Sequence, residues 1–264
     1  LTKKFSILTF GCQMNRHDSE RIAGLLKKDG YTATEIIKDA DLVVINTCSV
    51  REKAEEKLFT KLSEIRSQTC DKEPLIAVIG CVAQQEGEQI LKRSTAVDIV
   101  VGTQALQRLP RLIEKAAIER KTQIDIKPYD DVSFPLGIAA RSNPVKAYIT
   151  IIEGCNDFCS FCVVPYTRGH ERMRRSAEIL EEVRHATETG HNEIHLLGQI
   201  VNHYQDPDLP EHGFPKLLEQ INAVPAVKRI RFASPHPRHV SGQMIEAVRD
   251  LPKVCKHLHL PVQS

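Results

Sequence analysis

The alternation of short apolar runs with longer amphipathic runs is the feature that most constrains the fold of this chain. The apolar runs are rich in β-branched residues, which is typical of strands buried on both faces of a parallel sheet. In the first part of the chain they lie at residues 5–10, 42–46, 75–80 and 97–101. Patterns of helical period lie between and after them, at residues 17–28, 51–67, 87–92 and 104–117. This order predicts an N-terminal doubly wound α/β domain over residues 1–118.

A second alternating series follows residues 119–144, which carry several prolines and are interpreted as a linker. We expect strands at residues 146–152, 193–197, 228–232 and 257–260, and helices at residues 177–189, 214–222 and 240–251. Strands joined through helices with one hand of connection predict a β/α barrel over residues 145–264. Four strands are too few to close such a barrel. We therefore expect a partial barrel and a chain that belongs to a longer protein.

The composition indicates a globular protein. Of the 264 residues, 41% are hydrophobic and 27% are charged, which argues against a disordered chain. No apolar run is long enough to span a bilayer, and the first residues lead into a predicted strand without a secretory signal. The net charge of +2 is nearly neutral and does not identify a partner. We expect a cytoplasmic protein with no membrane partner, whose cysteines serve as metal ligands rather than in disulfides.

Three cysteines with C-x3-C-x2-C spacing follow the first strand of the second series: Cys155, Cys159 and Cys162. Three thiolates on one tight loop can bind three corners of a cubane cluster, which normally takes four cysteines. With no fourth cysteine nearby in sequence, one iron would be open to the amino and carboxylate groups of a ligand. A zinc knuckle is the alternative, but zinc prefers four closed ligands and paired C-x2-C spacings. The position also agrees with the active sites of β/α barrels, which lie at the carboxyl ends of strands.

The longer string around these cysteines, GCNDFCSFCVVPYTRG at residues 154–169, resembles the methylthiotransferase branch of the radical S-adenosylmethionine superfamily. The resemblance implies a [4Fe–4S] cluster on Cys155, Cys159 and Cys162. It also implies reductive cleavage of S-adenosylmethionine to methionine and a 5′-deoxyadenosyl radical, with the cofactor carrying the difficult chemistry.

Three more cysteines, Cys12, Cys48 and Cys81, each follow a predicted strand of the first domain. The carboxyl ends of parallel strands lie at one edge of a sheet, where open α/β sheets bind ligands. From spacing alone the three could hold a second cluster or be small buried apolar residues. The strings GCQMN, NTCSVREKAEEKLF and GCVAQ resemble the N-terminal domain of methylthiotransferases. This resemblance implies an auxiliary [4Fe–4S] cluster with an open iron that binds or supplies the inserted sulfur, whereas Cys70 and Cys255 match no motif.

Within the family, these strings are most similar to the MiaB-type branch, which modifies isopentenyladenosine in tRNA. The resemblance implies that C2–H of N6-isopentenyladenosine at position 37 becomes C2–S–CH3, at the expense of two S-adenosylmethionine molecules. The implied partners are the tRNA anticodon stem-loop, an electron donor such as flavodoxin or ferredoxin, and a sulfur or cluster delivery protein. We expect a monomer, and expect the rest of the barrel and an RNA-binding TRAM domain to lie beyond residue 264.

Further candidate cofactor contacts follow from position. Phe161 precedes the last cysteine of the loop and could contact the cofactor adenine or simply pack. Gln199, Ser234 and Gln263 follow the second, third and fourth strands of the barrel and are candidates for the amino acid or ribose groups of the cofactor. Arg168 opens a basic run that is either a solvated helix start or a contact for the cofactor carboxylate or tRNA phosphates. Ile200 replaces an asparagine usual in the family, which leaves the substrate contacts there open.

Other functions remain as alternatives. Within the family these are a tRNA enzyme for threonylcarbamoyladenosine and an enzyme for a ribosomal protein aspartate. From other classes they are a non-catalytic iron–sulfur electron carrier or redox sensor, and a zinc-bound RNA-binding module. No catalytic side chain is assigned from the sequence.

Overall fold

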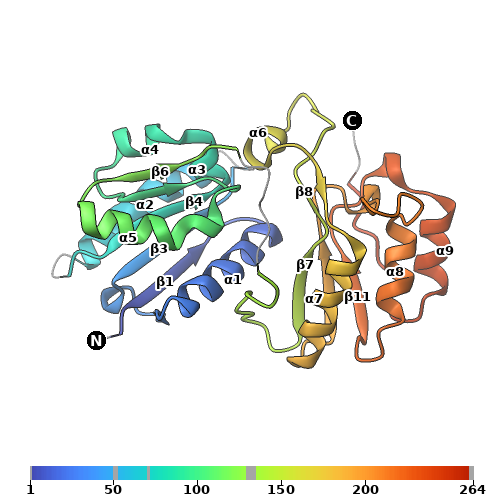
Figure 1. Ribbon diagram of the computed structural model, residues 1–264. Coiled ribbons are helices and arrows are strands. Elements are labelled where there is room, and N and C mark those ends of the chain that lie inside the picture. Colours follow the sequence, from blue (N-terminus) through green and yellow to red (C-terminus); the bar gives the residue numbers. More distant parts are fainter. Residues whose placement is uncertain (1, 50–52, 70–71, 129–134, 262–264) are drawn as a thin grey trace. The chain divides into compact units, whose positions relative to one another are not determined.

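The computed structural model describes residues 2–49, 53–69, 72–128 and 135–261, and its chain divides into two compact units (Figure 1). The first unit comprises Leu1–Ala140 together with Tyr166–Arg168, and the second comprises Arg141–Pro165 and Gly169–Ser264. The division falls inside the stretch that the sequence analysis interpreted as a linker.

A six-stranded parallel sheet forms the centre of the first unit, in the order β2-β1-β3-β4-β5-β6. Its strands are β1 (Lys4–Thr9), β2 (Thr32–Ala33), β3 (Leu42–Thr47), β4 (Leu75–Gly80), β5 (Ile99–Val101) and β6 (Gln123–Asp125). The chain adds β2 on one side of β1 and then crosses to β3 on the other side. This reversal makes a topological switch point between β1 and β3, where doubly wound sheets bind their ligands.

Helices cover both faces of this sheet, as the continuous apolar runs predict. Alternate strand residues such as Leu42 and Val44 pack with α1 (Gln13–Lys28) and α5 (Leu109–Glu119). Their neighbours Val43 and Ile45 pack on the other face, with α2 (Lys53–Gln68), α3 (Cys81–Glu86) and α4 (Glu88–Arg93). The predicted doubly wound domain is therefore confirmed.

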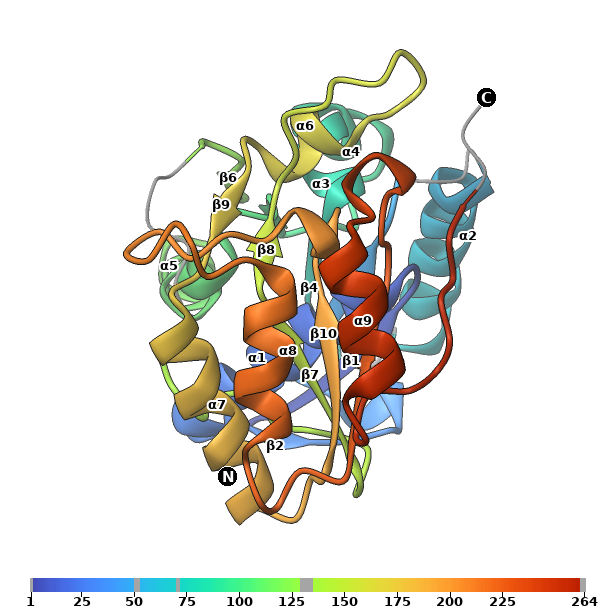
Figure 2. The same cartoon turned by 90° about the vertical axis from the view of Figure 1, so that its right-hand side faces the viewer.

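The second unit has a three-stranded parallel sheet in the order β11-β10-β7, with helices on one face (Figure 2). The strands are β7 (Lys146–Thr150), β10 (Glu193–Leu197) and β11 (Arg229–Phe232), and the helices are α7 (Ser176–Glu188), α8 (Phe214–Asn222) and α9 (Gly242–Asp250). A short antiparallel pair, β8 (Ile152–Glu153) and β9 (Arg172–Met173), precedes and follows a loop that ends in α6 (Val164–Arg168). This is the predicted partial β/α barrel, with its helices on the outside.

The predicted strand at residues 257–260 is wrong, because no strand forms there in the structure. A single bridge joins Val254 to Ile230 of β11. The backbone N–H of His257 then donates to the carbonyl of Cys255 at 2.8 Å, a tight turn that ends the extended run. The strands β2 and β6 were not predicted, because both are too short to show a period, and β6 lies within the predicted linker.

In the part of the chain that the structure describes, no helix is both long and apolar enough to cross a membrane.

The close packing of α1 gives a test of this fold. A Cβ on buried Gly24 would lie 1.5 Å from the carbonyl oxygen of Ile138, so Gly24→Ala must displace that segment. We expect a loss of about 1–3 kcal/mol in the free energy of unfolding from this clash, although alanine is the better helix former by roughly 1 kcal/mol. Urea unfolding measures the change. Gly242→Ala is the matched control because nothing lies within 4 Å of the added carbon, and equal stability of both variants would contradict the packing.

Candidate functional site

Three cysteines meet at the switch point of the first sheet. Cys48 and Cys81 come directly after β3 and β4, and Cys12 follows the end of β1 by three residues. These are adjacent strands whose ends are in register. The thiol of Cys48 lies within hydrogen-bonding reach of both Cys12 and Cys81. Cys48 and Cys81 are buried, whereas Cys12 is exposed. The structure thus brings the three residues into one group, here called the thiol trio, open to solvent at Cys12.

Two glycines allow this close approach. Gly11 has φ +135°, and a Cβ there would lie 2.4 Å from Cβ of Cys48. Gly80 has φ +94°, and a Cβ there would lie 2.5 Å from the side-chain oxygen of Asn46. Since both φ values are in the region that favours glycine, and both positions lack room for a side chain, only glycine fits before Cys12 and Cys81.

A buried amide pair lies beneath the thiol trio. Asn15 and Asn46 are both fully buried. Nδ2 of Asn15 donates to Oδ1 of Asn46 at 2.9 Å and to the carbonyl of Thr47 at 3.1 Å. Nδ2 of Asn46 donates back to the carbonyl of Asn15 at 2.8 Å, and the thiol of Cys12 donates to Oδ1 of Asn15 at 3.2 Å. These bonds join the start of α1 to the end of β3 and so set the separation of Cys12 and Cys48.

The surroundings of the trio favour thiolates. The hydrogen bond from Cys48 is the main cause that lowers the pKa of Cys12 to about 6 and of Cys81 to about 6. The positive charge of Arg168 lowers both values further, while burial acts in the opposite direction. Cys12 and Cys81 are therefore more acidic than ordinary thiols, and thiolates are the form that binds metals.

Arg168 itself lies inside the first unit. Its Nη2 is 2.7 Å from Oδ2 of Asp18, and both side chains are buried. The structure thus shows Arg168 in a buried ion pair beside the trio, and its contact with the cofactor carboxylate or tRNA phosphates stays a prediction. The later arginines of the basic run also have acidic partners, in the pairs Arg172–Glu153, Arg174–Glu182 and Arg175–Asp208.

The second group of cysteines lies on a loop of the second unit, between β8 and α6. Cys155 is buried, and Cys159 and Cys162 are partly buried. The N–H of Cys162 donates to the carbonyl of Cys159 at 2.9 Å, a turn that brings these two residues together. The N–H of Asp157 donates to Sγ of Cys155 at 3.5 Å. None of the six cysteines, all of which lie in the described residues, forms a disulfide.

The electrostatics of this loop differ from those of the trio. Burial is the main cause that raises the pKa of Cys155, and the nearby charges of Asp157 and Cys162 raise it further. The backbone N–H of Asp157 acts in the opposite direction, and the positive charge of a metal cluster would favour the thiolate further. The loop begins at Gly154, with φ +78°, where a Cβ would lie 2.1 Å from the carbonyl oxygen of His170.

The residues predicted to contact the cofactor differ in burial and in hydrogen bonding. Gln199 follows β10, and its Oε1 is buried without a hydrogen-bond partner, which a donor on a bound ligand would satisfy. Ser234 follows β11 with φ +60°, and its carbonyl accepts a hydrogen bond from the N–H of Val201 at 3.3 Å. The ring of Phe161 is 77% exposed, so it does not pack in the core. Gln263 lies outside the described residues, and Ile200 is buried.

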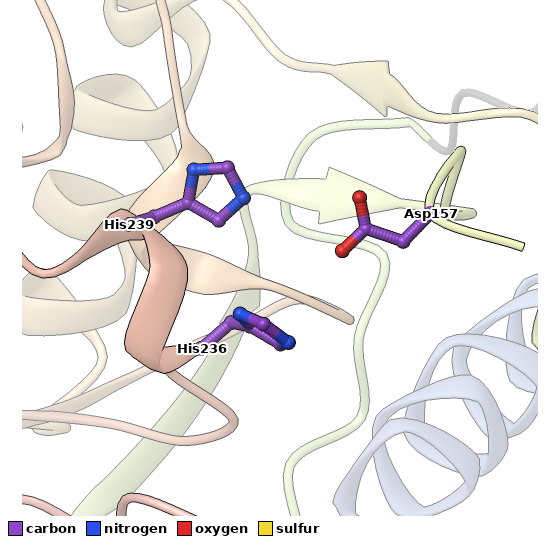
Figure 3. A group of neighbouring side chains, drawn as sticks. All are labelled: Asp157, His236 and His239. Carbon is purple, nitrogen blue, oxygen red and sulfur yellow. The ribbon is translucent and has the colours of Figure 1, made fainter. Parts of the chain in front are cut away.

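Sequence reasoning missed a group of side chains beside the cysteine loop. Asp157, His236 and His239 converge in the second unit (Figure 3). The only signal in the sequence is the spacing of the two histidines, because Asp157 is distant from them along the chain. Their proximity depends on how the cysteine loop and the loop after β11 fold, which the sequence does not show.

Comparison with known families agrees with this division. Residues 4–102 match the uncharacterized protein family UPF0004, and residues 149–264 match the radical SAM superfamily. The thiol trio lies in the first match and the cysteine loop in the second.

Curated relatives match nearly the whole chain. It is 45% identical to a tRNA-2-methylthio-N(6)-dimethylallyladenosine synthase of Caldicellulosiruptor saccharolyticus, over 99% of this chain and 56% of the relative. Proteins of the same name from Acidovorax sp. (45% identity, 100% of this chain, 59% of the relative) and Koribacter versatilis (44%, 99% and 59%) are similarly close. The chain therefore spans 56–59% of the length of these curated relatives.

A solved structure shares the fold. The radical S-adenosylmethionine methyltransferase TsrM of Kitasatospora setae, with tryptophan and a SAM analogue bound, superposes with a TM-score of 0.64. The match covers 94% of this chain and 57% of TsrM at 12% identity, so it supports the fold and not the reaction.

The buried ion pair allows a stability test. Asp18→Asn removes the charge of the buried carboxylate that is bonded to the Arg168 guanidinium, so we expect a loss of about 3–5 kcal/mol in the free energy of unfolding. Asp208→Asn is the control, because Asp208 and its partner Arg175 are 60% and 59% exposed and such pairs contribute about 0–1 kcal/mol. Urea unfolding of both variants measures the difference. A small loss in Asp18→Asn would mean that the pair is not formed in solution.

The acidity of the trio can be measured on the metal-free protein. We expect Cys12 to react with iodoacetamide with a midpoint at about pH 6. Cys48→Ala removes the main hydrogen bond to its thiolate, so the midpoint should move to higher pH. Mass spectrometry of the Cys12 peptide follows the reaction, with the peptide of Cys255 as internal reference. An unchanged midpoint in the variant would exclude Cys48 as the cause.

Proposed function

The chain belongs to the radical SAM methylthiotransferase family, and from this premise we propose that its protein transfers a methylthio group to tRNA. The proposed substrate is N6-isopentenyladenosine at position 37, and the proposed change replaces C2–H by C2–S–CH3. Supporting this choice, the curated relatives named above are each called tRNA-2-methylthio-N(6)-dimethylallyladenosine synthase.

The convergence of Cys12, Cys48 and Cys81 is the observation that carries the proposal. An enzyme that only initiates radicals needs the three cysteines of the loop and has no use for a second set. Sulfur insertion needs a place to hold the sulfur, and three thiols at a ligand-binding sheet edge supply one. We therefore propose two [4Fe–4S] clusters, one on the trio and one on Cys155, Cys159 and Cys162, together with S-adenosylmethionine.

The residues of both groups suit such clusters. Each group offers three thiols, and clusters held by three cysteines keep one iron for an external ligand. The lowered pKa of Cys12 and of Cys81 favours thiolates, and the buried amide pair sets the separation of Cys12 and Cys48. On the loop, the N–H of Asp157 directed at Sγ of Cys155 is the kind of hydrogen bond that tunes a cluster sulfur. When bound, the loop cluster supplies one-electron reduction of the sulfonium.

Other side chains would bind and orient S-adenosylmethionine. The unpartnered Oε1 of Gln199 would accept a hydrogen bond from its ammonium group, which orients the methionine part. The exposed ring of Phe161 would cover the adenine by stacking. Ser234 remains a proposed contact of the ribose or amino acid group, and so does Gln263. These groups position the cofactor, and no proton carrier is assigned among them.

The partners follow from the proposed reaction. They are the anticodon stem-loop of the tRNA, an electron donor such as flavodoxin or ferredoxin, and a sulfur or cluster delivery protein, in a cytoplasmic setting. The target adenosine would have to be unstacked from its loop, as single-stranded RNA bases are when enzymes act on them.

The decisive experiment uses the full-length protein, reconstituted with iron and sulfide without oxygen. We expect about eight iron atoms per chain, from two cubane clusters. Cys48→Ala should retain about half of the iron and still form 5′-deoxyadenosine, but methylthio product in isopentenyladenosine tRNA should fall to background. Cys159→Ala should lose cleavage of S-adenosylmethionine as well.

Cys255→Ala is the matched control, since Cys255 belongs to neither group, and it should keep full iron content and activity. Product formation by Cys48→Ala, measured by mass spectrometry of digested tRNA, would contradict the proposal. Product on a threonylcarbamoyladenosine tRNA or a ribosomal protein, with none on isopentenyladenosine tRNA, would replace the proposed substrate.

A further inference from the structure

A group of ionisable side chains in the second unit has no part in the proposed function. Asp157, His236 and His239 each offer one ligand atom, and these atoms lie within 4.8 Å of one another (Figure 3). Asp157 comes from the loop that carries Cys155. The histidines come from the loop after β11, with His239 at the end of the 3₁₀ helix Pro237–His239. Two segments far apart in sequence thus present metal-binding atoms to one point.

Two polar atoms of these side chains are buried without a hydrogen-bond partner. They are Oδ2 of Asp157 and Nε2 of His239. Buried polar atoms are nearly always paired, with protein or with a bound species, because leaving them unpaired is unfavourable. A carboxylate oxygen and an imidazole nitrogen are both electron-pair donors, so a single cation between them would satisfy both.

We propose that Asp157, His236 and His239 bind a divalent transition-metal ion of the zinc type, separate from the six cysteine ligands. Two imidazoles and one carboxylate are the donors that Zn²⁺ and Fe²⁺ prefer, whereas Mg²⁺ and Ca²⁺ prefer oxygen donors throughout. Three protein ligands leave one coordination position open, as in sites that bind an exchangeable ligand.

Neighbouring groups hold the ligands in place. The ring of His203 lies 4.2 Å from that of His239, and Nδ1 of His203 is 3.0 Å from Oε2 of Glu171. The side chain of Asn202 accepts from the N–H of His236 at 2.8 Å and donates to its carbonyl at 2.9 Å. Such outer contacts orient the ligands of metal sites and reduce the cost of assembling them.

Two existing interactions would change when an ion binds. Nδ1 of His236 accepts a hydrogen bond from the N–H of Arg238 at 3.1 Å. If either ring nitrogen of His236 coordinates the ion, Nδ1 can no longer accept this hydrogen bond. One neutral hydrogen bond is then replaced by a bond to the metal. Nη1 of Arg238 is 3.1 Å from Oδ1 of Asp157, but its side chain is 64% exposed and can turn into solvent. Arg238 is therefore a competitor of the cation, and its removal should strengthen binding.

A bound ion would tie the loop that carries Cys155 to the loop after β11. The site would thus limit the movement of Asp157, whose N–H contacts Sγ of Cys155.

The test uses the untagged full-length protein, with both cysteine groups loaded with iron and sulfide so that zinc cannot occupy them. After incubation with ZnCl₂ and desalting, elemental analysis should find about one zinc per chain in addition to unchanged iron. X-ray absorption at the zinc edge should show nitrogen and oxygen neighbours only. Asp157→Asn and His239→Ala should each weaken zinc binding at least roughly tenfold.

Arg238→Gln should instead strengthen zinc binding several-fold, a gain that a merely structural role of these residues would not produce. His191→Ala is the control, since His191 precedes β10 and lies outside the group. Absence of zinc from the loaded wild-type protein would overturn the proposal, as would sulfur neighbours in its absorption spectrum or equal binding by His239→Ala. If a variant also loses iron, the zinc-edge absorption spectrum of the wild-type protein decides whether the proposal holds.

Discussion

The pair of hydrogen-bonded side chains formed by Asn15 and Asn46 is the interaction on which the candidate site of the first unit depends. Both side chains are completely buried, so an unsatisfied amide atom would destabilise the fold. The two residues pair with each other and with backbone carbonyls at the start of α1 and the end of β3. This pairing gives the loop after β1 a definite position relative to β3. The relative position of the Cys12 and Cys48 thiols follows from this pairing.

The two groups of cysteines differ in the interactions that favour or oppose their ionisation. In the trio, a neighbouring thiol and the charge of Arg168 stabilise thiolates before any metal arrives. The buried pair with Asp18 keeps Arg168 close to the trio. On the loop of the second unit, burial and nearby negative charge oppose ionisation of Cys155. Under the proposed function, the trio would bind metal readily, whereas the loop would depend on the charge of its cluster.

Much of the fold could be predicted because buried strands have a strong local signature. The bounds of β4, β10 and α8 agree with the residues expected from apolar runs and helical period. Prediction failed where a strand depends on its neighbour. β2 and β6 are held by pairing with β1 and β5, and the expected strand at 257–260 is ended by a turn at Cys255. The stability that a short strand gains from pairing depends on its neighbour in the sheet, so no local sequence pattern reveals it.

By itself, the sequence determined the fold class, the six cysteines and the strands that they follow, because strand patterns and cysteine spacing are local. Tertiary structure decided which of these residues meet. It joined Cys12, Cys48 and Cys81, since strand order places β1, β3 and β4 side by side, and it paired Arg168 with Asp18. It also brought Asp157 to His236 and His239. Such contacts between distant segments arise from the packing of loops on a sheet. Local sequence patterns therefore do not predict them.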